Sequence, residues 1–74
     1  MAVHRPAPDP SQTRAELSVM ADALDRMRER AGAAAEPFVG TEREDVVTTV
    51  HEAERQILIA VRALHRAIKT LERG

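Results

Sequence analysis

The chain has 74 residues, with 11 Lys and Arg against 12 Asp and Glu, and it contains no cysteine, so neither a disulfide nor a thiolate metal site can form. No apolar run approaches the ~20 residues of a membrane span, and the bulky apolar residues are almost all Leu, Ile, Val and Met. A single core in so short a chain rarely contributes more than ~3–5 kcal/mol, so we expect one all-α domain that oligomerises.

Residues 1–10 carry three of the four prolines, at positions 6, 8 and 10. Each proline lacks a donor and disfavours helix in the residue before it, which predicts an extended, disordered arm. A mobile tail is the simpler interpretation, and a docking peptide is the alternative. The arm has no apolar core of the kind that signal peptides have, so we expect a cytoplasmic protein.

A first helix is expected over about residues 11–35. Ser11 can cap it, or Thr13 and Glu16 can form a capping box. Apolar side chains then recur in alternating steps of three and four, which predicts a narrow packing seam. The predicted seam comprises Leu17, Met20, Leu24, Met27, Ala31 and Ala34.

A loop is expected over residues 36–40, because Pro37 prevents the first helix from continuing. A connection this short makes the two helices antiparallel neighbours. Phe38 and Val39 are apolar in an otherwise turn-like stretch, and we expect them to plug the open end of the helix pair.

A second helix is expected over about residues 41–73, starting at a capping box of Thr41 and Glu44. Its apolar face is three heptad columns wide, as in a bundle rather than in a two-stranded seam. The columns are position a (Val50, Ile57, Leu64, Leu71), position d (Ala53, Ala60, Ala67) and position e (Glu54, Val61, Ile68).

The five consecutive apolar residues 57–61 surround this second helix, and Leu58 and Ile59 lie outside its apolar face. A helix that is apolar all round is buried on more than one side, so a second chain is the expected cover. The predicted assembly is a homodimer of antiparallel hairpins forming a four-helix bundle. The predicted interface comprises Val50, Ile57, Leu58, Ile59, Val61, Leu64, Ile68 and Leu71.

Charge is sorted along the second helix, at −4 over residues 41–54 and +4 over residues 55–74. Complementation of the helix dipole and ordinary solvation are the simpler interpretation. The alternative is antiparallel pairing of two copies of this helix, crossing near Leu58 and Ile59.

Three polar residues of the second helix have two interpretations each. Glu54 is the only acid on the apolar face; it either fixes register as a buried polar group or, as we favour, reaches water beyond the packed region. His51 and His65 are fourteen residues apart, about 21 Å along a helix, so they cannot share a metal ion. Surface histidines are favoured, and a pH-sensitive contact across an antiparallel dimer is the alternative.

The sequence offers no catalytic motif: no nucleophile elbow, glycine-rich loop or metal-ligand spacing is present. We therefore expect no enzyme activity, no cofactor, no metal and no membrane binding. The expected function is a small homodimeric protein–protein interaction module, a scaffold or adaptor that binds another protein. The alternative is a nucleic-acid-associated regulator that uses the basic stripe of Arg55, Arg62 and Lys69, although no aromatic residue is present there to stack on bases.

Overall fold

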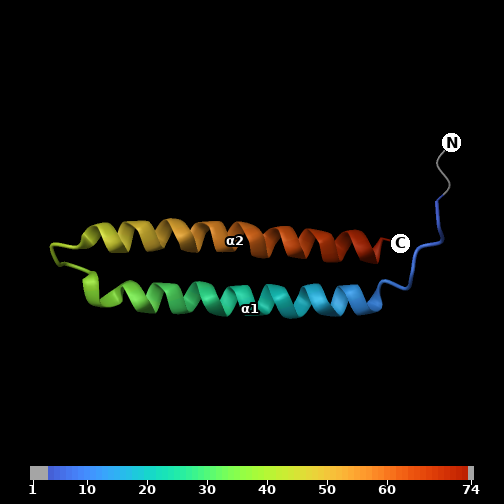
Figure 1. Ribbon diagram of the computed structural model, residues 1–74, viewed down its shortest axis with the longest axis horizontal. Helices are drawn as coiled ribbons and strands as arrows, with labels where there is room; N and C mark the ends of the chain where they lie inside the picture. The colour runs from blue at the N-terminus through green and yellow to red at the C-terminus, as the bar shows by residue number, and fades with distance from the viewer. Residues whose placement is uncertain (1–3, 74) are drawn as a thin grey trace.

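The computed structural model describes residues 4–73, which form two long α-helices packed side by side (Figure 1). Helix α1 spans Ser11–Ala35, a 3₁₀ turn η1 spans Glu36–Phe38, and helix α2 spans Glu44–Glu72. The helices are antiparallel, so the start of α1 and the end of α2 both lie at the end of the hairpin opposite the connection (Figure 1). The predicted all-α antiparallel hairpin is confirmed, and residues 4–73 contain no strand. Dimerisation stays a prediction.

Helix α1 begins directly after the arm and is capped by an acid from it. The Asp9 carboxylate accepts hydrogen bonds from the Ser11 hydroxyl at 2.6 Å and from the Ser11 amide at 3.1 Å. These two bonds hold the pKa of Asp9 below its ordinary value. The carbonyl of Pro10 accepts the Arg14 amide at 2.9 Å and so closes the first turn. The alternative start at a Thr13 capping box is wrong, because Thr13 already lies within this turn.

Helix α2 begins at Glu44, so the predicted start at Thr41 is wrong. The Thr41 hydroxyl donates to the Phe38 carbonyl at 2.6 Å and accepts the Arg43 amide at 3.1 Å, which makes it part of a turn. The Glu44 carboxylate reaches back to the amide of Gly40 instead of that of Thr41. The chain reverses at Gly40, whose φ of 75° lies in the left-handed region that glycine adopts without strain.

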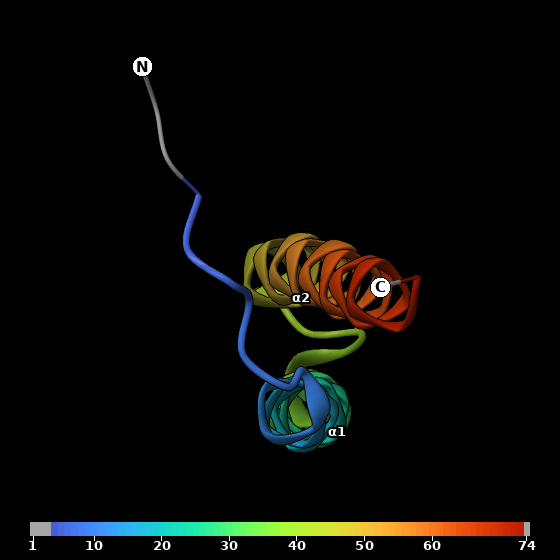
Figure 2. The ribbon, with the colours of Figure 1, turned by 90° about the vertical axis from the view of Figure 1, so that its right-hand side faces the viewer.

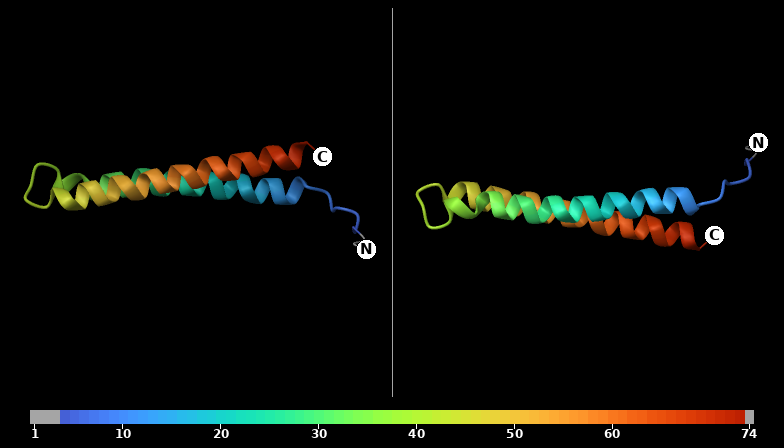
Figure 3. Two further views of the ribbon diagram at one scale, coloured as in Figure 1. Left: turned by 90° about the horizontal axis from the view of Figure 1, so that it is seen from above. Right: turned by 90° about the horizontal axis from the view of Figure 1, so that it is seen from below.

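The connection extends beyond the ends of both helices (Figure 3). Phe38 and Val39 are therefore exposed, and the expectation that they plug the helix pair is wrong. The 3₁₀ turn that contains Pro37 carries the chain past the last turn of α1 before it reaches Val39.

The internal seam of the hairpin follows residues four and three apart in both helices. Among residues 4–73, only Ala21, Ala35, Val47 and Val61 are buried. The half-buried residues of the seam are Leu17, Leu24, Arg28 and Ala31 in α1, and Val50, Glu54, Ile57, Leu64, Ile68 and Leu71 in α2.

The predicted seam of α1 is wrong at Met20, Met27 and Ala34, which are exposed. The side chains of Met20 and Met27 keep 49% and 53% of their surface in solvent. Ala21 and Ala35 occupy the contact instead, because a methyl group lets the backbone of α2 approach closely. The packed face of α1 is thus rotated by about one residue from the predicted one.

The hairpin is elongated, and it exposes more surface than a compact domain of the same mass. Its extents are 60 × 26 × 14 Å, and its radius of gyration of 17.9 Å compares with about 11 Å for a compact domain of this length. It exposes 6135 Å², whereas a compact monomer of 8.2 kDa exposes about 4,500 Å². No large side chain among residues 4–73 is fully buried. Neither described helix has the length and apolar character that crossing a membrane requires.

Candidate interaction surfaces

The seam divides the hairpin into two long sides that differ in chemistry. Seam residues occur in pairs, i and i+4, such as Leu17 with Ala21 or Ile57 with Val61. With 100° between successive residues, position i+1 lies on one flank of the seam and position i+3 on the other. Because the helices are antiparallel, equivalent flanks of α1 and α2 face the same side of the hairpin.

We call these two flanks of the hairpin the polar side and the apolar side. The polar side consists of the i+1 residues: Ser18, Asp25 and Gly32 of α1 with His51, Leu58 and His65 of α2. The apolar side consists of the i+3 residues: Met20, Met27 and Ala34 of α1 with Ala53, Ala60 and Ala67 of α2. Three of the six residues on the polar side are ionisable, whereas none of the six on the apolar side is.

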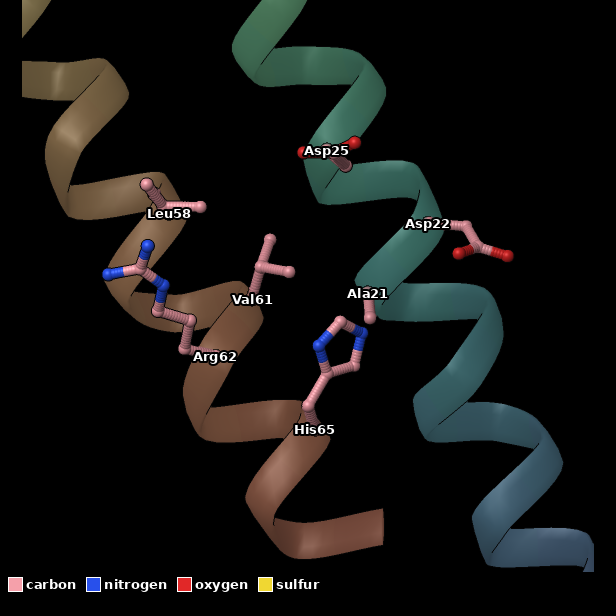
Figure 4. A pocket seen from close by; sticks show the side chains of 7 residues that line it. All are labelled: Ala21, Asp22, Asp25, Leu58, Val61, Arg62 and His65. Carbon is pink, nitrogen blue, oxygen red and sulfur yellow. The ribbon is translucent and has the colours of Figure 1, made fainter.

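The polar side contains a shallow groove of about 290 Å³ (Figure 4). It is lined by Ala21, Asp22, Asp25, Leu58, Val61, Arg62 and His65. The close-up shows the His65 imidazole between the two helices, next to Ala21 (Figure 4). One turn further along, Arg28 forms an ion pair with Asp25 at 2.7 Å. The hydrogen bond to Asp25 raises the pKa of Arg28, so this guanidinium stays charged.

Glu54 lies in the seam opposite Gly32. Its side chain is only 25% exposed, and its Oε1 is buried without a hydrogen-bond partner among residues 4–73. The carboxylate lies against this glycine, since a Cβ atom on Gly32 would be 3.4 Å from Glu54 Oε2. His51 Nε2 lies 3.9 Å from Glu54 Oε1. Glu54 therefore lies within the packed region. The favoured prediction from the sequence, that it lies beyond this region and reaches water, is wrong.

The two histidines of α2 are both exposed, and both lie on the polar side. Across residues 4–73, no group of three His, Asp or Glu side chains is arranged to hold a metal ion. Asp25 of this side instead forms a local pair with Arg28, and elsewhere on α2 Arg55 pairs with Glu52 at 2.8 Å.

On α1, the apolar side contains two methionines, Met20 and Met27, and both are exposed. On α2 the corresponding column is made of Ala53, Ala60 and Ala67. The sequence assigned the two methionines to the internal seam and so missed this surface. No signal in the sequence distinguishes the two arrangements, because Ala21 and Ala35 extend an alternative seam in equally regular steps of four and three.

The predicted interface residues are divided by the structure among three places. Val61 is buried within the hairpin, and Val50, Ile57, Leu64, Ile68 and Leu71 are half-buried along its seam. Leu58 is half-buried on the polar side. Ile59 lies on the outer face of α2 and is 50% exposed. Helix α1 thus covers part of the apolar belt that the sequence assigned to a second chain.

The arm leaves α1 and runs past the C-terminal end of α2 (Figure 2). A recess of about 440 Å³ lies between them. It is lined by Ala7, Pro8, Asp9, Pro10, Thr13, Thr70 and Leu71. Residues 4–9 carry no helix or strand, and the part of the predicted disordered arm before residue 4 lies outside the described residues.

The two ends of the hairpin carry opposite charge. Residues 24–60, at the connection end, include eight acids and five bases, a net charge of −3. Residues 11–23 and 61–73, at the open end, include five bases and three acids, a net charge of +2. The hairpin is therefore an electrical dipole along its length.

Comparison of the chain with protein-family models, with curated proteins and with solved structures finds no match.

Proposed function

We propose that this protein is a small self-associating helical module, a homodimer whose outer helix faces bind another protein as a scaffold or adaptor. The observation that carries the proposal is the incomplete cover of its apolar residues. Only four of the residues that the structure describes are buried, and two of them are alanines. A two-helix layer can cover each apolar stripe from one direction only, and a second layer is what completes such a core.

The exposed area supports the same proposal. The hairpin exposes about 1,600 Å² more than a compact monomer of its mass. A standard interface buries about 800 Å² on each partner, so this excess can accommodate one dimer contact. The arm and the elongated shape contribute to the excess, and they leave further surface for a different protein.

Analytical ultracentrifugation of the full chain at micromolar concentration tests self-association. The expected mass is about twice 8.2 kDa, with circular dichroism showing high helix content. A helical, cooperatively unfolding species of 8.2 kDa would refute the proposal, because it would show that one hairpin is a sufficient core.

A nucleic-acid-associated regulator remains the second candidate, and one observation favours it. Five basic side chains in the C-terminal half of α2 are exposed: Arg55, Arg62, Arg66, Lys69 and Arg73. Binding to a labelled duplex or single strand, with an affinity that falls steeply with salt, would support this candidate. Binding that is weak and independent of oligonucleotide type, with a stable dimer, favours the interaction module.

A further inference from the structure

We infer that a second copy of this chain docks on the apolar side of the hairpin, reversed end to end, so that α2 packs against α2 of the partner. The inference rests on the proposed self-association and specifies its surface and orientation. It moves the centre of the contact away from Leu58 and Ile59, to Ala60 and the two methionines.

The composition of the apolar side suits a dry contact. Met20 and Met27 place flexible, polarisable side chains in solvent, where they can fill an irregular opposing surface. The alanine column of α2 permits another helix to approach at the short end of the usual 8–10 Å range. None of the six residues carries a charge or a side-chain donor that a partner would have to satisfy.

The polar side is a poor alternative for the same contact. It holds the Arg28–Asp25 ion pair, and Glu54 lies next to it with one oxygen already unpartnered. Removing such groups from water without adding partners costs free energy for each charge. Both histidines also lie there, and a dry contact would remove their polar imidazole rings from water.

The pattern on the apolar side is compatible with a two-fold axis. Ala53 and Ala67 are equidistant in sequence from Ala60, and Met20 and Met27 are equidistant from the midpoint of residues 23 and 24. These two centres lie at the same level of the hairpin, because neighbouring Ala21 and Val61 face each other across the groove. One axis perpendicular to the helices can therefore place Ala60 on its own copy and Ala53 on Ala67, as an isologous contact requires.

The charge of the two ends determines the orientation. Reversed packing places the −3 end of each hairpin beside the +2 end of its partner, whereas parallel packing places like ends together. Exposed pairs contribute only ~0.2–1 kcal/mol each, so the preference comes from several pairs together. It weakens as salt screens the charges, while the apolar contact persists.

Two lysine substitutions of matched exposure test the surface. Met27 is 53% exposed on the apolar side, and Ile59 is 50% exposed on the outer face of α2. Met27→Lys should raise the dimer dissociation constant about 100-fold or more, because two ammonium groups per dimer lose water without gaining partners. Ile59→Lys should change it by less than about threefold. Circular dichroism of both variants checks that the hairpin remains helical.

Single cysteines test the orientation, since the chain has none of its own. Ala60→Cys should form a disulfide with its own copy under mild oxidation. Ala53→Cys and Ala67→Cys should each crosslink poorly alone but efficiently when mixed, because reversed packing separates each from its own copy by about 21 Å. Efficient crosslinking of Ala53→Cys with itself would show parallel packing and overturn the orientation.

The outcomes separate this inference from the proposed function. A wild-type chain that sediments as a monomer refutes self-association itself. A wild-type dimer that resists Met27→Lys but dissociates with Ile59→Lys retains the proposed function and overturns the inferred surface. The dimer contact would then be assigned to the five consecutive apolar residues 57–61.

Discussion

Glu54→Met should stabilise the hairpin, because it removes a buried acceptor that has no hydrogen bond. Glu54 Oε1 is shielded from solvent, and His51 Nε2 is 3.9 Å away, beyond hydrogen-bonding distance. A buried polar group without a partner costs about 1–3 kcal/mol, and the 25% exposure of this side chain favours the lower end of that range. Methionine has a similar length and can fill the same space beside Gly32.

The expected gain is about 1 kcal/mol in the free energy of unfolding, which corresponds to a rise in Tm of about 4–8 °C for a chain of this size. Thermal unfolding followed by circular dichroism measures it, at one protein concentration for all variants because Tm of an oligomer depends on concentration. Glu54→Gln is the matched control. It keeps the acceptor oxygen and adds an amide with two donors, so it should gain less than methionine.

A fall in Tm on Glu54→Met, with Glu54→Gln unchanged, would refute this reasoning. That result would show that the oxygen accepts a hydrogen bond in solution that a glutamine can also accept. A His51→Gln background provides the second check. The gain from methionine should persist there, since an exposed pair at 3.9 Å contributes no more than ~0.2–1 kcal/mol.

Three further substitutions or conditions test other parts of the structure. Gly32→Ala should raise the free energy of unfolding by about 0.5–1 kcal/mol in the same assay, because alanine favours helix and its Cβ would meet Glu54 Oε2 at an ordinary 3.4 Å; a loss would show that the carboxylate cannot shift. Gly40→Ala should lower it by about 1–2 kcal/mol, since φ at this residue is 75°, and an unchanged Tm would contradict the left-handed turn. The hydrogen bond from Arg43 holds the pKa of Asp45 below its ordinary value of 3.8, so this carboxylate stabilises the fold above that pH and ceases to do so as the pH falls through the lowered value. Asp45→Asn should flatten the acid limb of a plot of Tm against pH, and a limb identical to that of the wild type would exclude Asp45 as a contributor.

The sequence by itself determined the architecture. Apolar residues at helical spacing, a break at Pro37 and too few residues for any wider connection leave a pair of antiparallel helices as the simplest arrangement. The sorted charge of α2 is also a property of the sequence alone, and the hairpin converts it into two oppositely charged ends. These features are local, because each depends on residues close together in the chain.

Only the tertiary structure decided which face of each helix is used. Steps of three and four can be continued through Met20 and Met27 or through Ala21 and Ala35, and the period of a helix does not distinguish them. The choice depends on how closely α2 can approach, which no residue of α1 sets alone. The position of Glu54 could not be predicted from the sequence either, because its carboxylate lies against Gly32, which is twenty-two residues away in the chain. A surface that binds another copy is defined by what the first contact leaves uncovered, so it follows from the packing of the two helices and not from the pattern of either one.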